Sequence, residues 1–102
     1  MNRYRVGFSR TADAQIEVIE AWWRENRPAA PDLFSGELEA AVRLLEISPL
    51  IGKAYPAAPA PEVRRLLIGR SRYHIYWEVD AGSHAVTVLS VWHARRGSGP
   101  RL

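Results

Sequence analysis

The sequence of 102 residues, of which 47% are hydrophobic and 25% charged, predicts one small globular domain over residues 1–102. It contains no cysteine, which excludes disulfides and thiolate metal sites, and its apolar runs are shorter than the roughly 18 residues that a membrane-spanning helix needs. The N-terminus lacks the long apolar stretch of a secretory signal, so we expect a cytoplasmic protein.

Positive charge is concentrated in the second half of the chain. The formal net charge is +3, but residues 1–51 carry −2 and residues 52–102 carry +5. Every cation except Lys53 is an arginine, and the planar guanidinium suits bidentate binding of phosphate or carboxylate. A GC-rich genome would explain the scarcity of lysine but not the uneven distribution. We therefore expect the second half to bind a macromolecular target.

A short strand and a first amphipathic helix are expected at the start of the chain. Residues 4–9 alternate as in a β-strand, with one side made of Tyr4, Val6 and Phe8. From about Thr11 the period becomes helical, and the apolar stripe consists of Ala12, Ile16, Ile19 and Trp23. Ser9 or Thr11 can cap the first turn. The helix should end near Asn26, because Pro28 disfavours helical backbone at the residue before it.

A second amphipathic helix should follow after a short connection. Pro31 suits the first turn of this helix, where its missing N–H costs nothing. The apolar stripe of the second helix consists of Phe34, Leu38, Val42 and Leu45. The stripe runs to Pro49, and the short connection predicts an antiparallel helical hairpin with one apolar face to bury.

The rest of the chain is expected to form a loop and three strands. Residues 49–61 are rich in proline, so they should form a loop rather than a helix or a central strand. Strand-like runs at residues 62–69, 72–80 and 85–93 are separated by short turns, which predicts an antiparallel meander. The last run is apolar on both parities, as is typical of a central strand. The order β-α-α-β-β-β predicts an α+β fold in which the helical hairpin packs on one face of a small, mainly antiparallel, twisted sheet.

Phrases along nearly the whole chain resemble the RelE/ParE superfamily of toxins. In order, they are Y-x-V-x-F-S, A-x-x-Q-I-x-x-I-x-x-W-W, L-x-x-x-P-x-I-G, V-R-R-L-L, R-Y-H-I-Y-W-x-V and V-L-x-V-W-H-A-R-R-G. Each phrase alone is weak, and their order and spacing carry the resemblance. It implies a β-α-α-β-β-β toxin of a type II toxin–antitoxin system, which arrests growth until a partner antitoxin wraps it in a hetero-oligomer.

The resemblance implies one of two activities. Some members cut mRNA on the ribosome, and a metal-independent endoribonuclease of that kind would use Arg65, Arg72 and His93, the last as a proton carrier near neutral pH. Such members typically add a dense basic cluster and a C-terminal tyrosine. Here the long loop offers only Lys53, and no tyrosine follows His93. We therefore prefer the ParE-like branch, which is associated with inhibition of DNA gyrase and in which no residue is assigned to catalysis.

The residues expected to bind the target lie in the basic half. They are Arg64, Arg65, Arg72, Tyr73, His93, Arg95 and Arg96. Arg64 and Arg65 are neighbours on a strand, so they point to opposite faces, and which of them is exposed stays open. His93 has an alternative role as a hydrogen-bonded residue at a strand end. We expect the guanidinium groups to line a single exposed surface.

The antitoxin is expected to contact Trp22, Arg95 and Arg96. It would lay an amphipathic segment over the helical hairpin and add a strand to a sheet edge. Trp23 continues the buried stripe, whereas Trp22 lies about 100° around the helix, either near the surface or packed against the long loop. The tail after His93 should be flexible. We expect no metal, no cofactor and no membrane partner. A third hypothesis is a non-toxic member that binds its antitoxin and regulates their shared operon.

Overall fold

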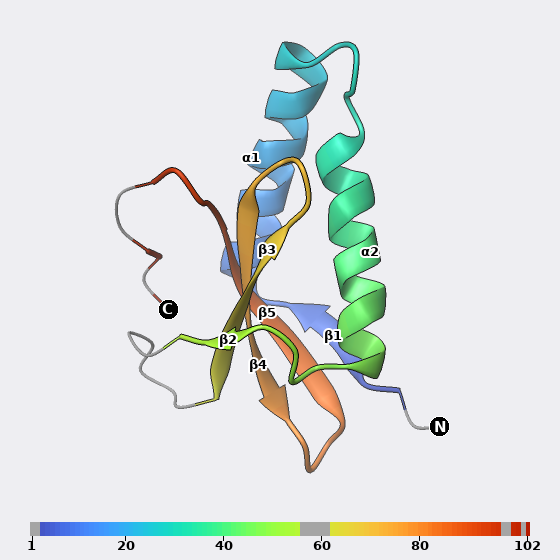
Figure 1. The fold of residues 1–102 in the computed structure, drawn as a ribbon, viewed down its shortest axis with the longest axis vertical. Helices are drawn as coiled ribbons and strands as arrows, with labels where there is room; N and C mark the ends of the chain where they lie inside the picture. The colour runs from blue at the N-terminus through green and yellow to red at the C-terminus, as the bar shows by residue number, and fades with distance from the viewer. Residues whose placement is uncertain (1–2, 56–61, 97–98, 101) are drawn as a thin grey trace.

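The computed structural model describes residues 3–55, 62–96, 99–100 and 102. In chain order, the elements are β1 (Arg5–Phe8), α1 (Arg10–Asn26), α2 (Leu33–Ile47), β2 (Lys53–Ala54), β3 (Val63–Ile68), β4 (Tyr73–Asp80) and β5 (Ala85–His93). The two helices form an antiparallel hairpin beside the twisted sheet (Figure 1). The expected α+β fold and its β-α-α-β-β-β order are confirmed, with the short β2 as an addition. Neither α1 nor α2 is long and apolar enough to cross a membrane.

The sheet has the strand order β1-β5-β4-β3-β2. β1 pairs with β5 in parallel, and all the other pairs are antiparallel. β5 therefore lies inside the sheet, as its apolar composition predicts. The last residue of β1, Phe8, lies opposite Val88. Among the described residues, no strand covers the β5 edge beyond this point.

α1 is capped as the sequence predicts, and its cap also anchors the helix to the sheet. The Ser9 hydroxyl accepts a hydrogen bond from the Ala12 amide at 3.1 Å and donates one to the Leu89 carbonyl at 3.1 Å. The predicted stripe of α1 packs into the core, with Ala12, Ile19 and Trp23 buried and Ile16 half-buried. A single side chain thus satisfies an N-terminal amide of α1 and ties that end to β5.

α2 departs from the prediction at its start and in its buried stripe. It begins at Leu33 with Asp32 at the N-cap, so Pro31 lies before the helix. Two turns replace the expected first turn of helix, in which the Ala30 amide donates to the Arg27 carbonyl and the Leu33 amide to the Ala30 carbonyl. The buried stripe consists of Phe34, Leu38, Ala41 and Leu45. Position 41 replaces the predicted position 42 because, at 3.6 residues per turn, it lies nearer the centre of the stripe.

The proline-rich segment contains a strand because the core holds its start. The buried Trp77 indole donates a hydrogen bond from Nε1 to the Pro49 carbonyl at 2.8 Å. Gly52 follows with a φ of 82°, and a Cβ there would overlap the Arg65 carbonyl. This close approach brings β2 beside β3 at the sheet edge. The prediction of a pure loop over residues 49–61 is therefore wrong at Lys53–Ala54, while residues 56–61 lie outside the described residues.

Glu37 joins α2 to the turn between β3 and β4. Its carboxylate accepts hydrogen bonds from the Arg70 amide and from the Ser71 amide, the latter at 2.9 Å. Gly69, with a φ of 27°, allows this approach because a Cβ there would overlap the carboxylate. Burial alone would raise the pKa of Glu37, but the Ser71 hydroxyl, the two amides and the Arg70 charge together lower it.

Replacement of Glu37 by glutamine should make the stability of the protein less sensitive to acid. A lowered folded-state pKa means that Glu37 stabilises the fold above its unfolded pKa, about 4.3, and that this contribution is lost as the pH falls through the lower folded value. Glu37→Gln should therefore lower Tm by several degrees at pH 7 and by less at pH 3. Thermal unfolding followed by circular dichroism across that range measures the difference.

The matched control is Glu39→Gln, on the exposed side of the same helix, which removes only a solvent-exposed ion pair with Arg43. A Tm difference between wild type and Glu37→Gln that stays constant with pH would contradict the assigned role of the carboxylate.

Candidate functional site

The predicted arginines lie on two sides of the sheet. Arg65 lies opposite Tyr76 in the β3–β4 register, on the face away from the helices, whereas Arg64 lies opposite the core residue Trp77. Arg64 donates to the Gly52 carbonyl at 3.4 Å, and both arginines are half-buried. The sequence analysis expects the arginines to line a single exposed surface. This expectation is wrong, because neighbouring residues of a strand face opposite sides of the sheet.

An open pocket of about 460 Å³, which we call the arginine pocket, joins three parts of the chain. Its lining comes from the end of α1, the β3–β4 turn and the end of β5. The lining residues are Trp22, Trp23, Arg27, Arg70, Ser71, Arg72, Tyr73, His93 and Arg95. Five of the residues predicted to bind a partner meet here: Trp22, Arg72, Tyr73, His93 and Arg95. The sequence analysis missed Arg27 and Arg70. Their positions just after the end of α1 and just after the end of β3 were the signal that could have identified them.

Arg72 reaches the pocket from a strained backbone conformation. Its φ is 65°, in the left-handed region that side chains other than glycine rarely adopt. Two backbone hydrogen bonds hold it there, from the Arg72 amide to the Ile68 carbonyl at 3.2 Å and from the Ala94 amide to the Arg72 carbonyl at 2.9 Å. Such a conformation costs on the order of 1 kcal/mol and is found most often at sites with a function. The β3–β4 turn and the end of β5 together fix the position of the Arg72 backbone, from which its side chain extends.

His93 is held at the end of β5 as a neutral side chain. Its ring packs edge-on against Tyr73 with centroids 4.8 Å apart, and its Nδ1 accepts a hydrogen bond from the Arg95 amide at 3.1 Å. Burial lowers the pKa of His93, and the charges of Arg95 and Arg72 lower it further. Both effects favour the neutral imidazole, so the positive charge of the pocket comes from the arginines.

The two adjacent tryptophans take different roles, as their helical spacing predicts. Trp23 is buried in the core, whereas Trp22 is 43% exposed and packs edge-on against Trp23 at 5.6 Å. The Arg27 guanidinium lies 5.1 Å from the Trp22 ring centre. The Ser71 Oγ lies close enough to the Glu37 carboxylate to lower the pKa of Glu37. The buried Trp23 Nε1 makes no hydrogen bond with any described residue, and a buried donor without an acceptor costs about 1–3 kcal/mol.

The opposite face of the sheet holds a second cationic and aromatic group, which we call the open-face cluster. It consists of Tyr55, Arg65, His74, Tyr76, Trp92 and Arg96. Arg65 lies 5.6 Å from the Tyr55 ring, and Arg96 lies 3.9 Å from the ring of Trp92. Burial lowers the pKa of His74, and the charges of Arg65 and Arg72 add to this effect. The cluster therefore keeps Arg65 and Arg96 away from the arginine pocket.

The end of the chain folds back onto this cluster. A Cβ at Gly99 would overlap the Tyr55 hydroxyl, and Pro100 is buried. Gly99 therefore lies against Tyr55 and Pro100 is buried, whereas the sequence analysis expects a flexible tail, which stays a prediction. Arg95 and Arg96 are exposed as expected, whereas Arg101 lies outside the described residues.

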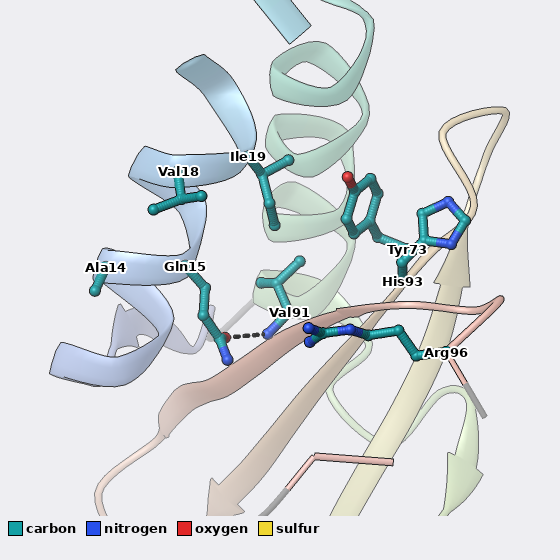
Figure 2. A pocket seen from close by; sticks show the side chains of 8 residues that line it. All are labelled: Ala14, Gln15, Val18, Ile19, Tyr73, Val91, His93 and Arg96. Carbon is teal, nitrogen blue, oxygen red and sulfur yellow. Dashed lines mark hydrogen bonds between the residues drawn. The ribbon is translucent and has the colours of Figure 1, made fainter. Parts of the chain in front are cut away.

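A third feature, which we call the α1–β5 groove, runs along the uncovered edge of β5. Its volume is about 420 Å³ and its lining residues are Ala14, Gln15, Val18, Ile19, Tyr73, Val91, His93 and Arg96 (Figure 2). The Gln15 side chain accepts hydrogen bonds from the Val91 amide at 2.7 Å and from the Ser90 hydroxyl at 3.1 Å. Val18 is 70% exposed. The sequence analysis missed this groove, although Ala14, Val18 and Trp22 follow one another at intervals of four residues.

Comparisons with known proteins agree with this architecture. The model of the family described as the ParE toxin of the type II toxin–antitoxin system parDE matches residues 6–97. No curated protein matches the sequence. A chain of the chromosomal ParDE system from P. aeruginosa is 18% identical with a TM-score of 0.67, and the match covers 88% of this chain and 95% of that one.

Two RelE-type structures are also similar. For a chain of the RelBE2 toxin–antitoxin complex from Mycobacterium tuberculosis, the identity is 22%, the TM-score 0.61, and the coverage 94% of this chain and 97% of that one. The isolated E. coli RelE toxin is 23% identical with a TM-score of 0.58, and the match covers 93% of this chain and 88% of that one. At such identities the likeness is one of fold, while the family model covers most of the sequence itself. The protein therefore belongs to the ParE toxin family of type II toxin–antitoxin systems, within the RelE/ParE superfamily.

Proposed function

We propose that this toxin arrests growth in the cytoplasm by binding DNA gyrase, without itself catalysing a reaction, until its cognate antitoxin neutralises it. The observation that carries the proposal is that Arg65, Arg72 and His93, the set that an endoribonuclease would use, do not all meet on one face of the sheet. RNA cleavage needs its proton carriers and cations at the same phosphate. Arg65 belongs to the open-face cluster, whereas His93 lies on the other face, where the Arg95 amide occupies its Nδ1.

The arginine pocket supplies the surface that such an inhibitor needs. Exposed arginines and an exposed tryptophan are the side chains that most often contribute large binding energies at protein interfaces. Arg72, Arg95 and Trp22 are all exposed here. We assign target binding to Arg64, Arg65, Arg72, Tyr73, His93, Arg95 and Arg96, as predicted, with the weight on the members that line the pocket.

Purified toxin should inhibit gyrase supercoiling and leave translated mRNA intact. Arg95→Glu should weaken the inhibition at least about tenfold, because reversal of an interfacial charge costs several kcal/mol. Arg43→Glu, which makes the same charge change on the exposed side of α2, should have little effect. A supercoiling assay and primer extension on ribosome-bound mRNA measure the two activities.

Cleavage of mRNA without any effect on supercoiling would contradict the proposal. Normal growth after induction of the wild-type toxin alone would instead support the non-toxic regulator of a shared operon.

The second candidate is a ribosome-dependent endoribonuclease that uses Arg65, Arg72 and His93. The observation in its favour is that Arg72 is close enough to both His74 and His93 to lower the pKa of each imidazole. Under this alternative, His93→Ala should abolish cleavage while the fold survives. The control His84→Ala, in the exposed β4–β5 turn, should retain activity. Primer extension on the same mRNA compares the variants, and full cutting by His93→Ala would remove this residue from the mechanism.

We further propose that the antitoxin occupies the α1–β5 groove and extends to Trp22, Arg95 and Arg96. The groove combines an exposed apolar helix face with a strand edge that no described strand covers, on which the Gln15 side chain holds the Val91 amide until a strand displaces it. These are the two features that an amphipathic segment and an added strand require. Arg96 lines the groove, which suits an antitoxin with acidic residues.

Val18→Asp should weaken antitoxin binding by at least about tenfold, because it places a charge in the apolar part of the groove. Leu50→Asp is the matched control, since Leu50 is 61% exposed and lies in the loop after α2, outside the groove. Isothermal titration calorimetry with the antitoxin encoded beside the toxin gene measures both variants. Equal binding by the two variants would exclude the groove.

A further inference from the structure

The arginine pocket gathers positively charged residues from three parts of the chain. Arginines line it from the end of α1, from the β3–β4 turn and from the segment after β5. They are Arg27, Arg70, Arg72 and Arg95. In the part of the chain that the structure describes, none of them lies within ion-pair distance of a carboxylate. The nearby Glu37 already accepts hydrogen bonds from the amides of Arg70 and Ser71.

Trp23 also lines the pocket. Its side chain is 8% exposed, and its Nε1, which makes no hydrogen bond with any described residue, is itself buried and has no surface open to a ligand. Several arginines that make no salt bridge within the described residues and line one pocket form a site for an oxyanion with several acceptor oxygens. A phosphate monoester offers three such oxygens and up to two negative charges, which matches this set better than a single carboxylate does.

The border of the pocket adds a surface for an aromatic ring. Trp22 is 43% exposed and lines the same pocket, with Arg27 against its ring. Exposed aromatic rings beside arginines are the usual stacking platforms for nucleobases. With a volume of about 460 Å³, the pocket has room for a phosphate together with part of the attached nucleoside.

We propose that the arginine pocket binds the terminal phosphate of a nucleotide or of a nucleic-acid strand, with the adjoining base stacked on Trp22. The site lies on the side of the sheet opposite Arg65, so it is separate from the open-face cluster. Ligand binding here involves no covalent step, and it does not depend on which macromolecule the toxin inhibits. Phosphate binding would neutralise part of the arginine charge, and the Trp23 indole, which lines the pocket, would report it.

Full-length toxin, separated from its antitoxin, is titrated with AMP, adenosine and inorganic phosphate in a calorimeter. It is also titrated with a short single-stranded oligonucleotide carrying either a 5′-phosphate or a 5′-hydroxyl. We expect each phosphorylated probe to bind about tenfold or more tightly than its unphosphorylated counterpart, with inorganic phosphate as a competitor. Equal affinities for AMP and the phosphorylated strand indicate a nucleotide site, and a tighter strand indicates a strand end.

The variant Arg70→Gln/Arg95→Gln should lower the affinity for AMP at least tenfold, while Arg43→Gln should change it less than twofold. The Trp23 indole N–H resonance, identified by its absence in Trp23→Phe, should shift when AMP is added to wild-type protein. This second measurement keeps the test decisive even where the double variant folds poorly.

Any of four results would overturn the proposal. The first is equal binding of the 5′-phosphate and 5′-hydroxyl strands. The second is an equal loss of affinity in Arg43→Gln, which would indicate attraction by net charge alone. The third is an unchanged Trp23 resonance at saturating AMP. Tighter binding of a glutamate-rich peptide than of AMP would also overturn it, in favour of a protein carboxylate.

Discussion

The parallel pairing of β1 with β5 is the constraint on which the rest of the structure depends. It places the first strand of the chain beside the last one, Arg5 opposite Ala85 through Phe8 opposite Val88. Because α1 starts directly after β1, it is laid along β5, and the Ser9 and Gln15 side chains bond to that strand. The same pairing stops at Val88, so the end of β5 remains an uncovered edge. The α1–β5 groove and the arginine pocket both lie at that end.

The two-residue period of the strands decides which side chains lie on the same face of the sheet and can act together. Tyr73 and His93 are paired across β4 and β5 and face α1, whereas Arg65 and Tyr76 are paired across β3 and β4 and face away from it. Residues that are close in a motif are thereby divided between two surfaces. A toxin of this fold can contact an antitoxin on one side while the other side holds a different set of cations and aromatic rings.

The arginine pocket is basic because several carboxylates of the chain bind other partners and do not line the pocket. Glu39 pairs with Arg43 on the exposed side of α2, Glu20 accepts a hydrogen bond from Ser35, and Glu37 binds two amides of the β3–β4 turn. Each of these acids is already engaged elsewhere, and none of them lines the pocket. The modest net charge of +3 therefore conceals a strong local excess of positive charge. It is this local excess, and not the total charge, that determines what the surface attracts.

Hydrophobic period and capping chemistry determined the elements from the sequence alone. The stripe from Ala12 to Trp23, the Ser9 cap, the α1 end at Asn26 and the three final strands all follow from local patterns, because burial of one face and satisfaction of helix ends act within a few residues. Likewise, the order of the phrases along the chain was enough to indicate the superfamily.

Tertiary structure alone decided what lies next to what. The short β2 exists because Trp77 holds the Pro49 carbonyl and Gly52 admits the Arg65 backbone. The arginine pocket exists because a turn, a helix end and a strand end meet in space, and Gly99 lies against the Tyr55 hydroxyl although the two residues are far apart in the sequence. Contacts between residues far apart in the sequence leave no periodic signal, since they depend on how the elements pack and not on the neighbours of each residue.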